Sequence, residues 1–260
     1  MTSEIVERVL RSSRYRDVDP ALLARLAAEE LPNARNADDA VKRVKRRLHQ
    51  VVGAFRGRMM PMAAGASDLT DPGLRKACVD AMGSHASTRE RLPHLGAFYP
   101  GIWAITGTPN RLLDLGCGLN PLSLPWMEIE HAMYVACDVD RRPLEVVRQF
   151  LHGVGQPHRV EARDLVAAPP DDHADVALML KLVTTLDRQQ PAAAARLIQA
   201  LRARHVVVSF PIRSLGGRGT GMERTYRGRL DRLVQESGRV SAVAEASIPN
   251  ELVFVLTLDG

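Results

Sequence analysis

The chain has 260 residues, 45% of them hydrophobic and 25% charged, which is enough to bury a core of ordinary size. No apolar run approaches the roughly 18 residues that a membrane-spanning helix needs, and the first residues lack the apolar centre of a signal peptide. These features predict a soluble, cytoplasmic protein without membrane contacts. Its three cysteines, Cys78, Cys117 and Cys137, lack metal-ligand spacing, so we expect reduced thiols, no disulfide and no metal.

The net charge of +5 is concentrated in the first 60 residues. These contain 13 Lys and Arg against 8 Asp and Glu, whereas the rest of the chain contains 22 of each. An excess of positive charge at one end of a chain suggests an acidic partner, most often nucleic acid. The alternative is a solvated helical surface.

The same 60 residues have the periodicity of three helices. The first carries an apolar stripe that includes Ile5 and Val9, and the second is expected to begin at Asp19 as N-cap, followed by Pro20. The third, from about Asp38, places its apolar residues on one face and its basic residues off that face. We expect the basic side to contact nucleic acid through Lys42, Arg43, Arg46 and Arg47.

Glycine and proline gather between residues 57 and 73, which predicts a boundary between a helical N-terminal domain, 1–73, and a second domain, 74–260, that opens with helices. From residue 111 apolar strands alternate with helices, the pattern of an α/β protein with a parallel sheet covered on both faces. Five strands are expected, at 111–117, 132–138, 158–164, 175–181 and 205–211. Two further strands near the C-terminus, joined by a short connection, indicate an antiparallel hairpin at the edge of the sheet.

A glycine-containing motif, Asp114-Leu-Gly-Cys-Gly-Leu-Asn120, follows the first strand, where sheets of this class bind cofactors. Asp138 ends the second strand, 22 residues after Gly116, and a carboxylate there can accept hydrogen bonds from ribose hydroxyls. A nicotinamide-binding fold would favour GxGxxG, but the third glycine is missing and Pro121 intervenes. The motif therefore favours S-adenosylmethionine, a cofactor without a pyrophosphate.

Polar residues end the third and fourth strands as well. Asp164 can accept from an adenine amino group, with Leu165 against the ring; the alternative is a helix cap. Lys181 ends an otherwise apolar strand and is expected to point into the same crevice, although a surface lysine is the alternative.

These residues, with the segments His85-Ala-Ser-Thr-Arg-Glu-Arg-Leu92 and Ser209-Phe-Pro-Ile-Arg-Ser-Leu-Gly-Gly-Arg-Gly-Thr-Gly-Met222, resemble one family. It is the group of aminoglycoside-resistance 16S rRNA methyltransferases, called Arm/Rmt and Sgm/Fmr, that act on N7 of guanine 1405. The resemblance covers most of the chain. It implies a class I S-adenosylmethionine-dependent methyltransferase domain, with a mostly parallel seven-stranded sheet ending in an antiparallel hairpin. It also implies an N-terminal helical domain that docks on the 30S ribosomal subunit, in a protein that we expect to be a monomer.

The resemblance also implies a set of S-adenosylmethionine contacts, in which Arg91 would meet the methionine carboxylate. The set consists of Phe55, His85, Ala86, Ser87, Arg91, Gly116, Asp138, Asp164, Leu165, Lys181 and Gln190. The sequence departs from the family at Val183-Thr184, where relatives often carry a proline, and this concerns the wall of the methionine pocket.

Guanine N7 has a lone pair and no proton, so alignment alone can support methyl transfer and we name no catalytic acid or base. Methyltransferases that act on exocyclic amines usually carry an Asn/Asp-Pro-Pro-aromatic motif after the fourth strand, where this sequence has Lys181-Leu-Val-Thr184. After the fifth strand, an arginine- and glycine-rich segment predicts RNA contacts by Arg213, Arg218 and Arg224, with a solvated loop as the alternative. Three other functions remain open: an adenine-N1 rRNA methyltransferase, a noncatalytic RNA-binding protein with this fold, and a nicotinamide-dependent oxidoreductase.

Overall fold

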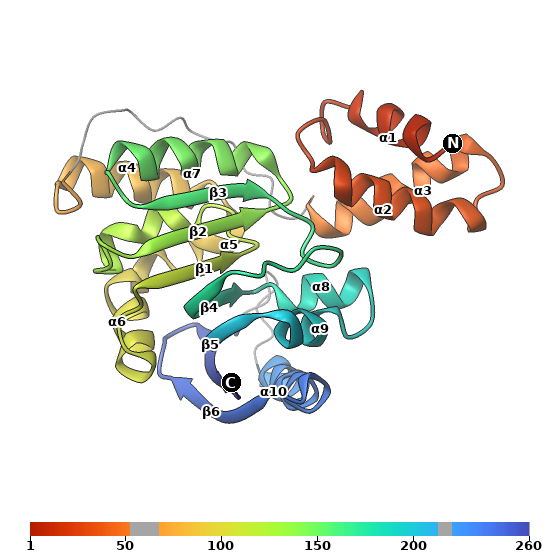
Figure 1. Ribbon diagram of the computed structural model, residues 1–260. Coiled ribbons are helices and arrows are strands. Elements are labelled where there is room, and N and C mark those ends of the chain that lie inside the picture. Colours follow the sequence, from red (N-terminus) through yellow and green to blue (C-terminus); the bar gives the residue numbers. More distant parts are fainter. Residues whose placement is uncertain (53–67, 213–219, 260) are drawn as a thin grey trace.

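Three helices form the N-terminal part of the structure, a computed structural model that describes residues 1–52, 68–212 and 220–259 (Figure 1). They are α1 (Thr2–Leu10), α2 (Pro20–Glu30) and α3 (Ala37–Val51). The predicted cap of α2 is confirmed, since the Asp19 side chain accepts from the backbone N–H of Ala21. Helix α3 begins just before the predicted position, after Asn36, whose side chain accepts from the N–H of Asp39.

The N-terminal helices share a hydrophobic core of their own. All its fully buried members lie between Ile5 and Val52, and they include Leu22, Leu26 and Leu48. The apolar stripes that the sequence predicts are the faces that meet there. This short stretch can therefore pack as a unit, distinct from the rest of the chain.

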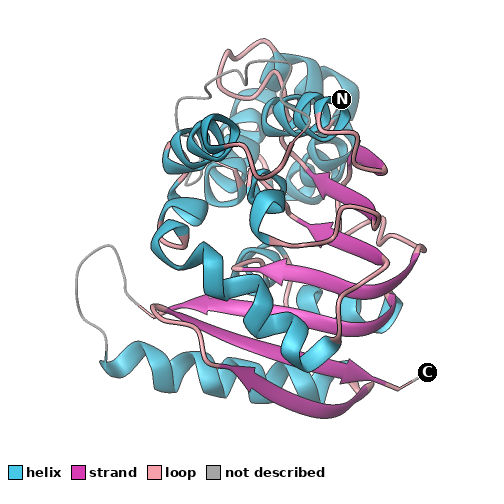
Figure 2. Ribbon diagram, turned by 90° about the vertical axis from the view of Figure 1, so that its left-hand side faces the viewer, coloured by secondary structure: helices cyan, strands magenta, loops and turns pink. Residues whose placement is uncertain are grey.

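All seven predicted strands are present and form one sheet in the order β3-β2-β1-β4-β5-β7-β6 (Figure 2). The bounds are β1 (Arg111–Leu115), β2 (Met133–Asp138), β3 (His158–Ala162), β4 (His173–Leu180), β5 (Arg202–Pro211), β6 (Val240–Ala246) and β7 (Glu251–Leu258). Strands β1 to β5 pair in parallel, and β7 pairs antiparallel with both β5 and β6. The predicted fold class is confirmed, including the terminal hairpin.

Helices cover both faces of this sheet because successive strand residues point to opposite sides. Leu112 and Tyr134 face α4 (Pro72–Gly83), α6 (Leu95–Thr106) and α7 (Arg141–Gly153). Leu113 and Val135 face α8 (Val183–Gln189), α9 (Ala193–Ala200) and α10 (Thr220–Ser237). One short helix, α5 (Ala86–Arg89), lies between α4 and α6 in the chain.

The N-terminal helices lie beyond the carboxyl ends of the parallel strands (Figure 1). One seam is made by backbone atoms: the N–H of Asp19 donates to the carbonyl of Val139 at 2.8 Å, and the N–H of Arg141 donates to that of Asp17 at 2.9 Å. The seam begins at the residue after Asp138. The edge of the sheet that the sequence marks as a cofactor site is therefore also the edge that meets the N-terminal part.

Within the described ranges, no helix is long and apolar enough to span a membrane, and no cluster of side chains could hold a metal ion. The three cysteines are buried free thiols. Burial raises the pKa of the Cys78 thiol to about 12, so it is protonated at neutral pH.

Candidate functional site

The loop after β1 depends on two glycines in left-handed backbone conformations. Gly116 has φ +62°, and a Cβ there would lie 2.7 Å from the Cδ1 of Leu182. Gly118 has φ +50°, and a Cβ there would lie 3.3 Å from the Cε1 of His85. Any residue with a Cβ would be strained at these two positions. Glycine therefore allows the backbone of the loop to lie close to the crevice.

Asp138, at the carboxyl end of β2, is fixed by the backbone around it. Its Oδ2 accepts from the N–H of Gly118 at 2.9 Å, and its Oδ1 accepts from that of Asp140 at 3.0 Å. Burial raises its pKa above the ordinary value, although these hydrogen bonds act in the opposite direction. The carboxylate still has lone pairs for a ligand, because it can accept about four hydrogen bonds.

A pocket opens at this edge, with a volume of about 100 Å³ among the described residues. Seven of the predicted cofactor contacts line it: His85, Ser87, Gly116, Asp138, Asp164, Leu165 and Lys181. Val51 and Val52, at the end of α3, form part of the same wall. The N-terminal helices thus contribute to the pocket at the carboxyl ends of the parallel strands.

Lys181 joins two elements at this pocket. It has φ +58°, and its Nζ donates to the Oε2 of Glu90 at 2.6 Å and to the carbonyl of Ser87 at 3.0 Å. The side chain points into the crevice and is not a surface lysine, since only 9% of it is exposed. It therefore links the end of β4 to the His85–Leu92 segment.

Arg91 is buried beside the pocket, and the residues that line the pocket do not include it. Its guanidinium forms a two-pronged pair with Glu251, at 2.7 and 3.2 Å, and donates to the Oδ1 of Asn120 at 2.7 Å. Burial would raise the pKa of Glu251, but the charges of Arg91 and Lys181 outweigh it and lower that pKa. The predicted contact with a methionine carboxylate stays a prediction, and it requires Arg91 to share its donors.

A buried polar network continues below the glycine loop. The Oδ2 of Asp114 accepts from Asn120 at 3.0 Å and from the hydroxyl of Tyr134 at 2.7 Å. Burial raises the pKa of Asp114 to about 6 despite these two donors. This network fixes the motif residues from below, because an unpaired buried polar group would be costly.

The remaining predicted cofactor contacts fall elsewhere. Gln190 does not line the described part of the pocket; its Nε2 donates to Glu29 at 2.7 Å and its Oε1 accepts from Arg196 at 3.1 Å. The neighbouring residue, Gln189, lines the described part of the pocket, and the cofactor contact of Gln190 stays a prediction. Phe55 and the side chain of Ala86 lie outside the described residues.

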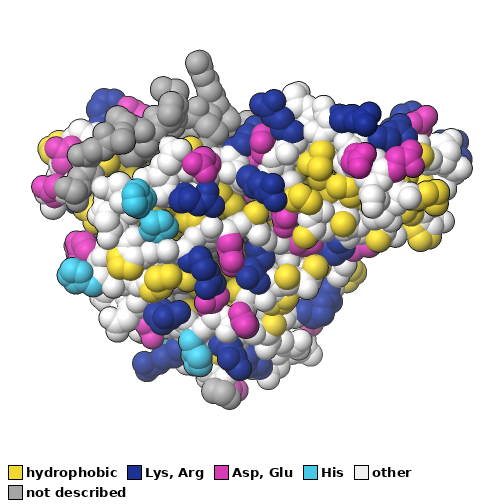
Figure 3. Space-filling view, turned by 45° about the horizontal axis from the view of Figure 1, so that its top comes forward, with side chains coloured by type: hydrophobic (Ala, Val, Ile, Leu, Met, Phe, Trp, Pro, Cys, Tyr) yellow, Lys and Arg dark blue, Asp and Glu magenta, His cyan; other side chains and the backbone are white. Residues whose placement is uncertain are grey.

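The predicted RNA contacts on α3 divide into two pairs. Lys42 and Arg46 are exposed, as predicted. Arg43 donates to Glu30 at 2.7 Å, and Arg47 pairs with Glu29 at 2.5 Å and donates to the carbonyl of Gln189 at 2.7 Å. Basic and acidic side chains accordingly lie next to one another on the N-terminal helices (Figure 3). Arg43 and Arg47 therefore make contacts within the protein, and the RNA contacts of all four residues stay a prediction.

A second groove, of about 570 Å³, lies between α10 and the segment that joins α8 to α9. Three arginines of α10 line it: Arg224, Arg229 and Arg232. No ion pair of the described residues involves them, whereas Arg227, on another side of α10, pairs with Glu223 at 3.0 Å and Glu245 at 2.8 Å. Arg224 is exposed, and Arg213 and Arg218 lie outside the described residues.

Sequence reasoning missed Glu251, Gln189 and Arg25. Glu251 had a signal, because an acid within the apolar strand ELVFVLTL is as unusual as Lys181 at the end of β4. Arg25 had none, since its partner Asp164 lies 139 residues away in the chain.

Comparison with known proteins places the chain in a family. Residues 11–255 match the family described as ribosomal RNA methyltransferase (FmrO). The chain is 38% identical to the 16S rRNA (guanine(1405)-N(7))-methyltransferase of Micromonospora echinospora, over 97% of this chain and 95% of that one. It is 41% identical to the protein of the same name from Frankia casuarinae, over 96% of this chain and 91% of that one.

Solved structures agree with this family. The 16S rRNA methyltransferase RmtF, in complex with S-adenosyl-L-homocysteine, has a TM-score of 0.80 at 30% identity and covers 99% of this chain and 98% of its own. The 16S rRNA methylase RmtB has a TM-score of 0.78 at 26% identity, with 100% and 99% covered. The sheet, its glycine loop and the match over nearly the whole chain lead to one conclusion: the chain belongs to the FmrO family of ribosomal RNA methyltransferases.

Proposed function

We propose that this protein is an S-adenosylmethionine-dependent 16S rRNA (guanine(1405)-N(7))-methyltransferase that acts on the 30S subunit and confers aminoglycoside resistance. The observation that carries the proposal is the conjunction of near full-length similarity to enzymes of that name with an intact cofactor edge. The Asp138 carboxylate, the Asp164 carboxylate and the Gly116 turn meet at that edge, as a functional cofactor site requires. A noncatalytic descendant would have no need to keep them.

The residues at the pocket fit S-adenosylmethionine, which supplies an activated methyl group when bound. Asp138 would hold the ribose hydroxyls, and Asp164 the adenine amino group with Leu165 against the ring.

Catalysis by this chain would rest on alignment. Guanine N7 offers a lone pair and loses no proton, so no side chain is needed as a base. Burial of His85 lowers its pKa to about 4, which keeps the ring neutral at the pocket near pH 7. Lys181, held by Glu90 and by the carbonyl of Ser87, fixes the His85–Leu92 segment against the end of β4 at the same edge.

Two surfaces are proposed to contact RNA. Lys42 and Arg46 on α3 are exposed, and the arginines of the α10 groove flank the other side of α8 from the cofactor pocket. Unpaired arginines suit phosphate contacts, because their fork can bind two oxygens at once.

The direct test is a methyl-transfer assay with labelled S-adenosylmethionine on purified 30S subunits. Cleavage at N7-methylated guanine followed by primer extension should stop at guanine 1405, and cells that express the protein should resist kanamycin and gentamicin. A stop at an adenine of the decoding region would instead identify an adenine-N1 methyltransferase. Absence of transfer, with cofactor binding intact, would contradict the proposed reaction.

A further inference from the structure

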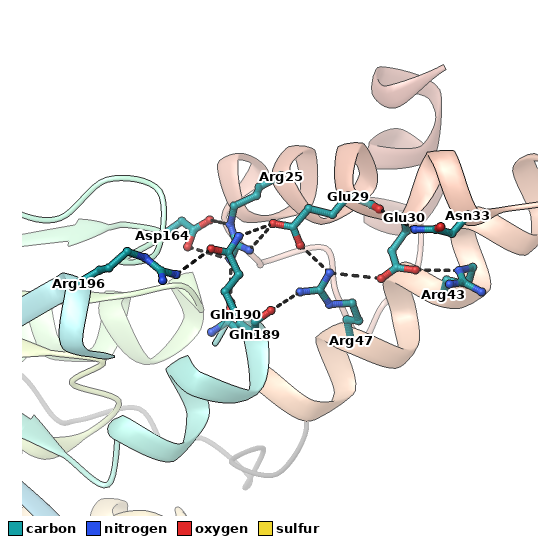
Figure 4. A network of polar contacts seen from close by, with 10 residues as sticks. All are labelled: Arg25, Glu29, Glu30, Asn33, Arg43, Arg47, Asp164, Gln189, Gln190 and Arg196. Carbon is teal, nitrogen blue, oxygen red and sulfur yellow. Dashed lines mark hydrogen bonds and ion pairs between the residues drawn. The ribbon is translucent and has the colours of Figure 1, made fainter. Parts of the chain in front are cut away.

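An arginine of the N-terminal part reaches the cofactor edge of the sheet. The Nε of Arg25, on α2, donates to the Oδ2 of Asp164 at 2.6 Å, and its Nη2 donates to the Oδ1 at 3.2 Å (Figure 4). Both side chains are withdrawn from water, with 12% of Arg25 and 2% of Asp164 exposed. Such a two-pronged pair fixes the orientation of the carboxylate, because both of its oxygens accept from one planar group.

Arg25 contacts Asp164 without itself lining the described part of the pocket. Asp164 and Gln189 line the pocket, and the described residues that line it do not include Arg25. Asp164 also accepts from the N–H of Val166 at 3.1 Å, so three of its roughly four acceptor positions are filled. The position that remains lies on Oδ2, which has a single donor. The carboxylate is therefore held in one orientation with capacity for one further hydrogen bond.

The same arginine is tied to a wider interdomain network. Its Nη1 donates to Glu29 at 3.0 Å, and its Nη2 donates to the Oε1 of Gln189 at 2.7 Å (Figure 4). Arg47, on α3, closes the network by pairing with Glu29 and donating to the carbonyl of Gln189. Burial would raise the pKa of Glu29, but hydrogen bonds from Arg25, Gln190 and Arg47 outweigh it and lower that pKa. A movement of α2 or α3 would thus change the positions of Asp164 and Gln189, which line the side of the pocket proposed to hold adenine.

We propose that Arg25 is a positioning residue of the cofactor site, which holds Asp164 ready to accept the adenine amino group and makes cofactor affinity depend on the docked N-terminal helices. The inference rests on the proposed function, because it assumes that Asp164 accepts from adenine. It adds to that function a residue from outside the methyltransferase fold. Binding of RNA by the N-terminal helices and binding of the cofactor would then influence one another equally, as linkage requires.

The test is calorimetric titration of S-adenosylhomocysteine into the full-length protein and the variants Arg25→Gln, Asp164→Asn and the double variant. Arg25→Gln should weaken binding by roughly tenfold, within the usual coupling range for residues in direct contact. In the Asp164→Asn background the same change should cost much less. Arg25→Lys, which keeps the charge but not the fork, should fall between wild type and Arg25→Gln.

A second ligand separates positioning from a general structural role. The analogue of S-adenosylhomocysteine whose base is unsubstituted purine lacks the amino group, so its affinity should be the same for wild type and Arg25→Gln. Arg35→Gln is the matched control, since Arg35 lies on the same domain and, among the ion pairs of the described residues, pairs only with Asp39. This control should bind both ligands as wild type does.

The outcomes distinguish the inference from the proposed function. If wild type binds S-adenosylhomocysteine and Arg25→Gln binds it equally well, the inference is wrong and the function stands. If Arg25→Gln weakens both ligands by the same factor, Arg25 supports the domain as a whole and does not act through the amino group. If wild type binds neither ligand, the proposed function fails and the inference falls with it.

Discussion

At the scale of single residues, the site depends on two carboxylates that already accept hydrogen bonds from the protein and keep lone pairs for a ligand. Asp138 accepts from two backbone N–H groups, and Asp164 accepts from Arg25 and Val166. Their remaining lone pairs are aimed by the protein before any ligand arrives. Such preorganisation reduces the cost of ordering side chains on binding.

Asp138→Ala should weaken binding of S-adenosylhomocysteine by about ten- to a hundredfold. A hydrogen bond to a charged group contributes about 1.5–3 kcal/mol, and the variant also frees the N–H of Gly118. Calorimetric titration measures the loss, with Asp80→Ala as the control because Asp80 is exposed and pairs with Lys76. An unchanged dissociation constant for Asp138→Ala would refute the assignment of this residue to the cofactor.

His85 should make stability depend on pH in acid. Burial lowers its pKa from 6.5 to about 4, so the folded state favours the neutral ring. Its contribution is therefore complete above about pH 6.5 and is lost as the pH falls through about 4. The loss between pH 7.5 and pH 5 is about 2 kcal/mol. Denaturant unfolding of wild type and His85→Gln at both pH values should show a steeper fall for wild type; parallel falls would contradict the assignment.

At the scale of secondary-structure elements, α10 presents two kinds of arginine. Arg224, Arg229 and Arg232 line the groove beside α8, whereas Arg227 is held by Glu223 and Glu245 and lies 5.5 Å from the centre of the Phe254 ring. An arginine already paired with two carboxylates has less to gain from phosphate. The helix thus supplies its own control for a test of RNA binding.

Changing Arg224, Arg229 and Arg232 together to glutamine should weaken binding to 30S subunits and make its salt dependence shallower. For duplex nucleic acid, the log–log slope falls by about 0.9 for each phosphate that the protein no longer neutralises. Arg227→Gln should leave both quantities near wild type, because Glu223 and Glu245 already neutralise the Arg227 guanidinium. Loss of these exposed ion pairs should cost the fold little. Filter binding at several salt concentrations measures both. Each groove arginine is also changed to glutamine singly. If Arg227→Gln weakens binding to 30S subunits as much as these single changes do, the groove has no special role in RNA binding.

At the scale of the whole molecule, the N-terminal helices with their own hydrophobic core meet the sheet at the cofactor edge. The backbone seam follows Asp138, and the Arg25 network ends on Asp164, so both proposed cofactor acids adjoin the N-terminal helices. The pocket is lined by the end of α3 through Val51 and Val52 and by α8, and α8 also borders the α10 groove through Asp187. That span is too broad for a single nucleotide and suits a folded ribonucleoprotein surface.

The assembled 30S subunit should therefore be a far better substrate than protein-free 16S RNA. The measurement is the initial rate of methyl transfer to equal concentrations of each, at one ionic strength. Intact 50S subunits serve as the control for nonspecific transfer to RNA. Comparable rates on protein-free 16S RNA would contradict recognition of the assembled surface.

The order of elements and the position of the cofactor edge follow from local signals in the chain. Apolar strands separated by helices allow few arrangements, and the carboxyl ends of parallel strands must meet at one edge. Gly116, Asp138, Asp164 and Lys181 were predictable for that reason, because each lies at the carboxyl end of a strand or within two residues of it. The caps and apolar faces of the N-terminal helices were equally local signals.

Packing between elements, in contrast, selects the distant groups that complete the site. Arg25 and Asp164 are 139 residues apart, and Arg91 and Glu251 are 160 apart, so no spacing in the chain relates them. Whether α3 offers its basic residues to solvent depends on how the N-terminal helices dock on the rest of the chain, and that docking engages Arg47 while leaving Lys42 exposed. Gln189 lines the described part of the pocket for a similar reason, since the side chain that faces inward depends on where α8 ends. Periodicity determines the faces of an element, whereas the partner of each face is determined by the tertiary structure.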